Sequence, residues 1–228
     1  MLQKKNKISI IIFYIFILFF LSTINNKSLT LATSNFFKIK KIKISGVNED
    51  IKNDIYIQIN KSNEINNINS NKQNLDKVLR NNTIIDDYII KKKFPSTLII
   101  YLKQTSLIAS YFKNGKKYYL GSNGKEILAE KYHINADTPV IYGNFNSENF
   151  LELTSHFNKN NIYIGDIKQF YYFENKRWDF KTKDGILVKL PRDNLENVLK
   201  LCFYLLTKDK NKKIIDLRVS NQVIMSNE

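Results

Sequence analysis

An uncharged apolar stretch runs from residue 8 to residue 24 and is the longest hydrophobic feature of the chain. Lys4, Lys5 and Lys7 precede it, and no acidic residue does. The stretch is at the short end of what a helix needs to cross a bilayer core. It predicts a transmembrane signal anchor over 8–24, behind a cytoplasmic N-terminus at 1–7. The alternatives are a cleaved signal peptide, for which 29–34 offers only a poor cleavage site, and a buried core helix.

After a polar linker at 25–36, the hydrophobic positions follow short periods. Alternation with period two predicts strands at 37–46, 84–93 and 97–103. Helical spacing predicts a helix over 48–59, with Ile51, Ile55 and Ile59 on one face, and a second short helix over 75–81. The first domain, at 37–105, therefore has the order β-α-α-β-β.

The second domain, at 106–228, is richer in strands. Asn114-Gly115 and Asp184-Gly185 favour tight hairpin turns, and each is flanked by alternating apolar residues. We further expect strands at 125–128, 139–143, 162–173 and 214–225, and helices at 147–158 and 192–208. The fold class is thus α+β: a single N-terminal transmembrane helix, a β-α-α-β-β domain, and a mostly antiparallel β domain with two helices. A final strand with no successor leaves one edge unpaired, and such an edge is a template for another chain.

Composition adds little to this picture. The chain has 43% hydrophobic and 13% aromatic residues, as a folded protein does. A net charge of +15 is compatible with binding to nucleic acid or to an anionic membrane surface. The alternative is a lysine-rich composition that spreads charge over all faces of the protein. No run resembles a nucleic-acid-binding arm, which favours the last interpretation.

Residues that carry catalysis or metal binding form no known pattern. Cys202 is the one cysteine and lies among residues of helical period, so we interpret it as a buried thiol rather than a nucleophile. His133 and His156 lack metal-ligand spacing, and there is no glycine-rich phosphate loop. The adjacent tyrosines at 118–119 and 171–172 fit sheet packing better than a platform for nucleic acid. The lack of such motifs favours a binding protein over an enzyme, and we expect no cofactor, metal, nucleic acid or small-molecule substrate.

A series of short motifs follows the linker in a definite order. They are Ile42-Lys-Ile-Ser-Gly46, Lys93-Phe-Pro95-Ser-Thr-Leu, Tyr119-Leu-Gly-Ser-Asn-Gly124, Arg177-Trp178-Asp-Phe, Gly185-x-x-Val188-Lys-Leu190-Pro191 and Ile215-Asp216-Leu217-Arg218-Val. Their order and spacing resemble the FtsQ/DivIB family of bacterial cell-division proteins. The chain departs from that family at Tyr111, where Trp is common, and at Gly121 and Ser122, where an acidic residue is common.

The resemblance implies a POTRA domain at 37–105, an FtsQ-type β domain at 106–228, and a non-enzymatic scaffold of the divisome. Such a protein crosses the cell inner membrane once, keeps its bulk in the periplasm and concentrates at the septum. Its partners are FtsB-like and FtsL-like coiled-coil proteins, held by β-strand addition at the last strand. The partner-binding residues would then be Val219, Ser220, Asn221, Gln222, Val223, Ile224 and Met225, together with Arg177.

An exposed contact between Arg177 and an acidic partner residue would contribute only about 0–1 kcal/mol. Two other hypotheses stay open. One is another membrane-anchored POTRA adaptor, in outer-membrane assembly or secretion. The other is an exported enzyme.

Overall fold

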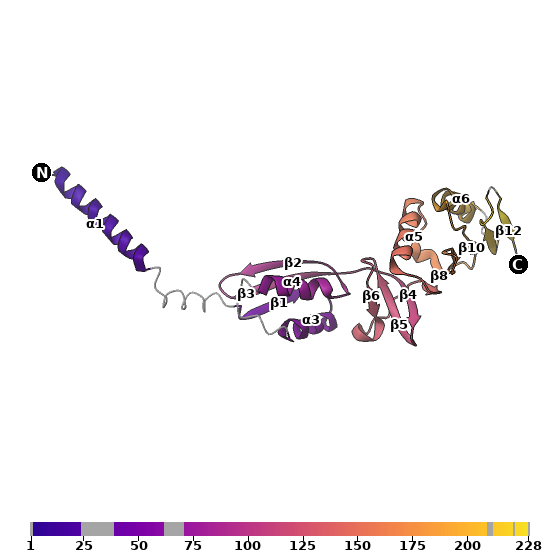
Figure 1. Cartoon of the computed structure of the whole chain (residues 1–228), viewed down its shortest axis with the longest axis horizontal. Coiled ribbons are helices and arrows are strands. Elements are labelled where there is room, and N and C mark those ends of the chain that lie inside the picture. The colour runs from indigo at the N-terminus through magenta and orange to yellow at the C-terminus, as the bar shows by residue number, and fades with distance from the viewer. Residues whose placement is uncertain (1, 24–38, 62–70, 209–211, 221, 228) are drawn as a thin grey trace. The chain divides into compact units, whose positions relative to one another are not determined.

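The computed structural model describes residues 2–23, 39–61, 71–208, 212–220 and 222–227. Two compact units divide the chain. The first takes residues up to 46 together with 52–79 and 88–101, and the second takes 47–51, 80–87 and 102–228. Figure 1 shows the elements of both.

Helix α1 (Leu2–Thr23) includes residues 8–23 of the stretch for which the sequence predicts a transmembrane span, and residue 24 lies outside the described residues. In the described part of the chain, no helix is at once long enough and apolar enough to cross a membrane. The prediction of a span over 8–24 is therefore not confirmed.

The first globular elements are two helices and a three-stranded sheet, in the predicted order β-α-α-β-β. They are β1 (Lys41–Ser45), α3 (Glu49–Lys61), α4 (Asn71–Asn81), β2 (Ile85–Lys93) and β3 (Thr97–Gln104). The sheet order is β1-β3-β2, with β1 parallel to β3. The N–H of Ile51 donates to Asn48 Oδ1 at 3.0 Å, which starts α3. The predicted apolar face of α3 is confirmed, since Ile51, Ile55 and Ile59 are all buried.

A nine-stranded mixed sheet forms the second unit, in the order β12-β11-β10-β9-β8-β7-β4-β5-β6. Its strands up to β10 are β4 (Leu107–Lys113), β5 (Lys116–Gly121), β6 (Glu126–Leu128), β7 (Val140–Tyr142), β8 (Ile167–Tyr172), β9 (Trp178–Thr182) and β10 (Leu187–Lys189). Most neighbours are antiparallel; β4–β7, β7–β8 and β10–β11 are parallel. The predicted hairpin turn is confirmed by positive φ at both Asn114 (52°) and Gly115 (73°).

One face of this sheet is packed against α5 (Ser147–Lys159) and α6 (Leu195–Lys208). The core is aromatic: the rings of Phe150 and Phe170, and those of Phe157 and Phe180, lie edge-to-face with centroids 5.1 Å apart. Cys202 on α6 is fully buried, and burial raises the pKa of its thiol to about 12. Its interpretation as a structural thiol is confirmed.

The strand expected over 162–173 begins later than the sequence predicts. Residues Ile164–Asp166 form a 3-10 turn, η2, in which the N–H of Asp166 donates to the Tyr163 carbonyl at 3.0 Å. Another 3-10 turn, η1 (Ala129–Tyr132), follows β6. Strand β8 starts at Ile167, directly after this turn, and the Asp166 carbonyl at the end of the turn accepts the Lys183 N–H at 2.7 Å.

Candidate functional site

The C-terminal segment forms two short strands, not the single strand expected over 214–225. They are β11 (Ile214–Asp216) and β12 (Ile224–Ser226), which run antiparallel with Ile215 opposite Met225. The Asp216 carboxylate accepts a hydrogen bond from the Arg218 N–H at 3.1 Å, a geometry that turns the backbone. The segment Asp216-Leu-Arg218 therefore ends β11 instead of continuing it.

Strand β12 lies at the end of the sheet order, so no other described strand pairs with its outer side. Hydrogen bonds of β11 fix which backbone groups face inward. The Leu187 N–H donates to the Lys213 carbonyl at 2.8 Å, and the Leu217 N–H donates to the Lys189 carbonyl at 2.9 Å. Ile215, which lies between Lys213 and Leu217, therefore directs its backbone groups toward β10, whereas the Lys213 N–H donates to the Ser226 carbonyl at 3.0 Å. Ile214, like the other even-numbered residue of β11, directs its groups toward β12.

This alternation continues across the pair. Ile224 lies opposite Asp216, and Ser226 lies opposite Ile214, so Ile224 and Ser226 use their backbone groups to bind β11. Met225, which lies between them in β12, must then direct its N–H and C=O groups outward. Val223 and Asn227 flank the strand. The outer edge of β12 thus offers a row of backbone donors and acceptors.

The side chains at this edge are partly apolar. Met225 packs against the core of the second unit, whereas Ile224 is 55% exposed. Val219 and Val223, in the segment between the strands, are also exposed. An added strand would meet both backbone hydrogen-bonding groups and apolar side chains here.

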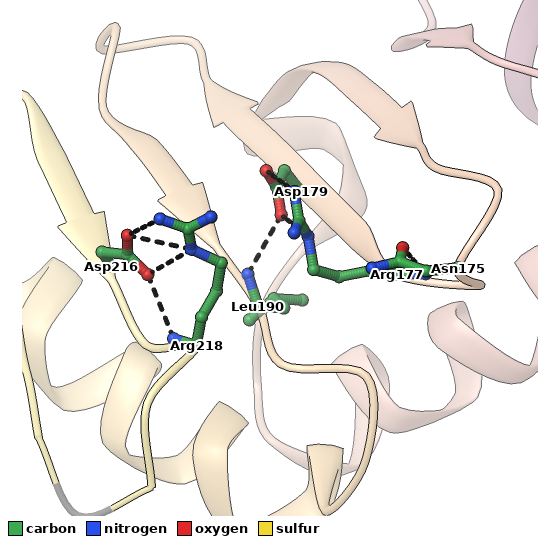
Figure 2. A network of polar contacts seen from close by, with 6 residues as sticks. All are labelled: Asn175, Arg177, Asp179, Leu190, Asp216 and Arg218. Carbon is green, nitrogen blue, oxygen red and sulfur yellow. Dashed lines mark hydrogen bonds and ion pairs between the residues drawn. The ribbon is translucent and has the colours of Figure 1, made fainter.

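Two Asp–Arg pairs lie on the sheet beside this edge. Arg177 donates from Nε to Asp179 Oδ1 at 3.2 Å and from Nη2 to Oδ2 at 3.3 Å. The same Oδ1 accepts the Leu190 N–H at 3.3 Å, which ties β9 to the end of β10. Figure 2 shows these contacts next to the second pair, in which the Arg218 guanidinium donates to both carboxylate oxygens of Asp216.

The two carboxyl groups have opposite electrostatic settings. Burial raises the pKa of Asp179 above its usual range, against the lowering effect of the Arg177 charge and hydrogen bonds. The hydrogen bonds from Arg218 hold the pKa of Asp216 below its usual range. They outweigh the opposing effect of burial, because Asp216 is less deeply buried than Asp179. Burial therefore disfavours the charged form of Asp179, and its hydrogen bonds to Arg177 and to the Leu190 N–H stabilise the fold.

An open hollow of about 550 Å³ lies on the face of the sheet opposite α5 and α6. The side chains that line it are basic, aromatic and aliphatic, and they come from β8 to β11: Tyr171, Phe173, Arg177, Asp179, Lys181, Gly185, Leu187, Lys189, Lys213, Ile214 and Arg218. Lys181, Lys189 and Lys213 make the rim of this hollow positive.

The structure places the predicted partner-binding residues in different settings. Val219 and Ser220 follow β11, Gln222 and Val223 precede β12, and Ile224 and Met225 lie within it, while Asn221 is outside the described residues. Arg177 lies just before β9, where its guanidinium binds Asp179 and covers the Phe173 ring at 4.2 Å. Arg177 therefore lines the hollow, but its guanidinium already forms an ion pair with Asp179. The role of all these residues in binding stays a prediction.

Sequence reasoning missed the two acidic residues of the site. Asp179 and Asp216 each stand two positions from an arginine, and residues two apart on a strand share a face. That spacing was a signal for paired charges on the open side of the sheet. Among the described residues, no group of His, Cys, Asp and Glu could hold a metal ion.

Comparisons with known proteins agree with this architecture. The family model "Cell division protein FtsQ/DivIB, C-terminal" matches residues 110–218, and the model "POTRA domain, FtsQ-type" matches residues 37–104. Cell division protein FtsQ of Rickettsia bellii (strain RML369-C) is 28% identical over 162 residues, which are 65% of this chain. The match spans 58% of that relative's length.

Among solved structures, the chain resembles the major extracytoplasmic domain of the cell-division protein DivIB from Geobacillus stearothermophilus. The identity is 17% and the TM-score 0.33, over 45% of this chain and 93% of that one. A similarity of this size is too small to carry an argument.

The two matched domains and the mixed sheet define a bacterial cell-division protein built from a POTRA domain and an FtsQ-type β domain. The chain belongs to the FtsQ/DivIB family. That family is one of cell-division proteins and is not a known enzyme family.

Proposed function

We propose that the protein is a non-enzymatic scaffold of the divisome that binds FtsB-like and FtsL-like coiled-coil partners by β-strand addition at β12. The observation that carries this proposal is the outer edge of β12, where Met225 directs its backbone groups away from the sheet and is flanked by Val223 and Asn227. Main-chain hydrogen bonds at such an edge supply affinity, and alternating side chains supply selectivity.

The neighbouring hollow supports the same proposal. A partner segment that leaves β12 would reach the basic rim of Lys181, Lys189 and Lys213. Arg177 can meet a partner carboxylate only in competition with Asp179, so we expect it to shape the hollow more than to bind.

We also propose that α1 holds the chain at the inner membrane, with residues 1–7 in the cytoplasm, the two domains at 37–105 and 106–228 in the periplasm, and the protein concentrated at the septum. Most large apolar side chains from Ile8 to Leu21 are exposed, for instance Phe19 at 70%, and need a nonaqueous surrounding. The basic residues before the stretch favour an N-terminus on the cytoplasmic side.

The proposal predicts the effect of proline at the outer edge. Val223→Pro removes an outward N–H without removing a hydrogen bond to β11, so binding should fall while the fold persists. Val223→Ala keeps that N–H and serves as the matched control. Each full-length variant would be tagged, expressed in its native bacterium and captured from solubilised membranes, and the captured proteins identified by mass spectrometry.

We expect short single-span coiled-coil division proteins with the native chain and with Val223→Ala, and a loss of about tenfold or more with Val223→Pro. Equal capture of these proteins by all three chains would show that they do not bind at β12. Absence of such proteins from the native capture would overturn the scaffold function itself.

A further inference from the structure

One face of the three-stranded sheet of the first unit is left open. The opposite face is buried, because Ile44 pairs with Ile100 and both point into the core with α3 and α4. On the open face, Ile89 is 56% exposed and Tyr101 is 45% exposed.

Lysines follow this open face with the period of a strand. Lys41 and Lys43 lie on β1, beside Thr97 and Ile99 of β3 in the parallel register. Lys91 reaches across from β2, with its Nζ 5.5 Å from the centroid of the Tyr101 ring. Lys93, two residues on, shares the face of Lys91. We call this set of lysines, with Ile89 and Tyr101, the basic face.

Acidic side chains do not neutralise the basic face. Asp87 stands two residues before Ile89 and is the acidic residue nearest to these lysines along β2, but Asp86 and Asp87 both act on Lys103, which Asp86 binds at 2.8 Å. Within the described ranges, Lys41, Lys43, Lys91 and Lys93 form no ion pair and are all exposed. The positive charge of the face is therefore available to a ligand.

We propose that the basic face binds the anionic phospholipid headgroups of the membrane at which α1 holds the chain. A sheet face with lysines at every second residue of two strands is complementary to a negatively charged surface, and exposed Ile89 and Tyr101 suit the boundary between headgroups and acyl chains. The inference rests on the proposed position of α1. From Thr23 to Lys41 the backbone spans at most about 60 Å, so the face stays within reach of the bilayer.

The test uses the full chain with Thr97→Cys, labelled at that position with a fluorophore. Cys202 is buried and leaves Thr97→Cys as the accessible thiol. The protein is reconstituted into vesicles of phosphatidylcholine, with or without phosphatidylglycerol, that contain lipid with a nitroxide on its headgroup. We expect about twofold or more stronger quenching with phosphatidylglycerol, and loss of this difference at about 1 M salt, where charges are screened within about 3 Å.

Two variants of equal charge separate the basic face from overall charge. Lys41→Glu, Lys43→Glu, Lys91→Glu and Lys93→Glu together should abolish the difference in quenching. The matched control changes four exposed lysines of the second unit instead: Lys116→Glu, Lys159→Glu, Lys168→Glu and Lys200→Glu. It should keep the difference. Equal quenching in both kinds of vesicle, or equal loss in both variants, would overturn the proposal, and an acidic protein would then be the better ligand to seek.

Flotation distinguishes this proposal from the position of α1. A chain that floats with neutral vesicles but shows no difference in quenching keeps α1 at the membrane and loses the lipid-binding face. A chain that floats only with phosphatidylglycerol, and only with its face lysines intact, supports the face and refutes the position of α1. A chain that floats with neither refutes both. Capture of division proteins through β12 is independent of all three results.

Discussion

At the scale of single residues, two Asp–Arg pairs organise the sheet next to the candidate edge. The Asp179 side chain is only 6% exposed, and it joins β9 to the end of β10 through Arg177 and the Leu190 N–H. The pair formed by Asp216 and Arg218 instead turns the chain out of β11. The Arg177–Asp179 pair connects β9 to the end of β10, and the Asp216–Arg218 pair ends β11 before the segment that leads to β12.

Asp179→Ala should destabilise the fold. It leaves the Leu190 N–H and the partly buried Arg177 guanidinium without their acceptor, which typically costs several kcal/mol. Because Arg177 keeps some exposure, we expect a loss of about 2–3 kcal/mol in the free energy of unfolding. Trp178 is the single tryptophan and is buried, so its fluorescence in a urea titration reports the transition. Asp193→Ala, at a carboxylate that is 90% exposed, is the control and should change stability by less than about 0.5 kcal/mol.

Asp216 predicts a pH dependence of stability. Its folded pKa is lowered, so its ionised form adds stability that is present above the unfolded pKa of about 3.9 and disappears as pH falls through the folded pKa. Asp216→Asn should therefore lower stability by about 1 kcal/mol at neutral pH, and this difference should shrink below about pH 4. The pKa of Asp179 is raised in the folded protein, so ionisation of Asp179 lowers the free energy of unfolding as pH rises. A difference that is the same at pH 3 and pH 7 would show that the charge of Asp216 adds nothing.

At the scale of elements, glycine positions decide how closely strands and turns approach. A Cβ on Gly143, at the end of β7 with φ of 105°, would lie 2.1 Å from the Tyr172 carbonyl oxygen. Gly185, in the hairpin turn with φ of 92°, has nothing within 4 Å of the same position. We expect Gly185→Ala to cost about 1–2 kcal/mol from backbone strain alone, and Gly143→Ala at least about 3 kcal/mol because the strands must separate. Urea titrations of both variants give the comparison, and equal costs would contradict the packing at Gly143.

Local chemistry explains which elements the sequence predicts well. Alternation and turn dipeptides identify the hairpin at Asn114-Gly115, and helical spacing identifies α3 and α5. The end of β11 could not be found in this way, because apolar residues continue through Leu217 and Val219. The turn depends on the Asp216 side chain binding the backbone of Arg218, a contact that hydrophobic periodicity does not register.

The candidate site was predicted in part. The open edge at the chain's end followed from sequence order, and β12 does lie last in the sheet. The direction of each backbone group could not be predicted from the sequence, because it depends on the register between β11 and its two neighbours. A shift of one residue would exchange the inward and outward positions.

At the scale of the whole molecule, the chain joins an apolar helix, a POTRA domain and an FtsQ-type β domain, and each offers a different surface. We assign the membrane to α1, lipid headgroups to the basic face, and division partners to β12. The proposals use separate residues; the one for the basic face rests on the position proposed for α1, whereas strand addition at β12 can be tested without either. The central one is strand addition at β12, since it accounts for the role in division.

Amide hydrogen exchange tests that claim most directly. The full chain would be measured alone and in a complex with its coiled-coil partners, co-purified from native membranes. The account predicts that the amides of Val223, Met225 and Asn227 exchange quickly in the free chain and become protected in the complex, while those of Ile224 and Ser226 change little. An intact complex in which the three outward amides still exchange as quickly as in the free chain would contradict strand addition at this edge.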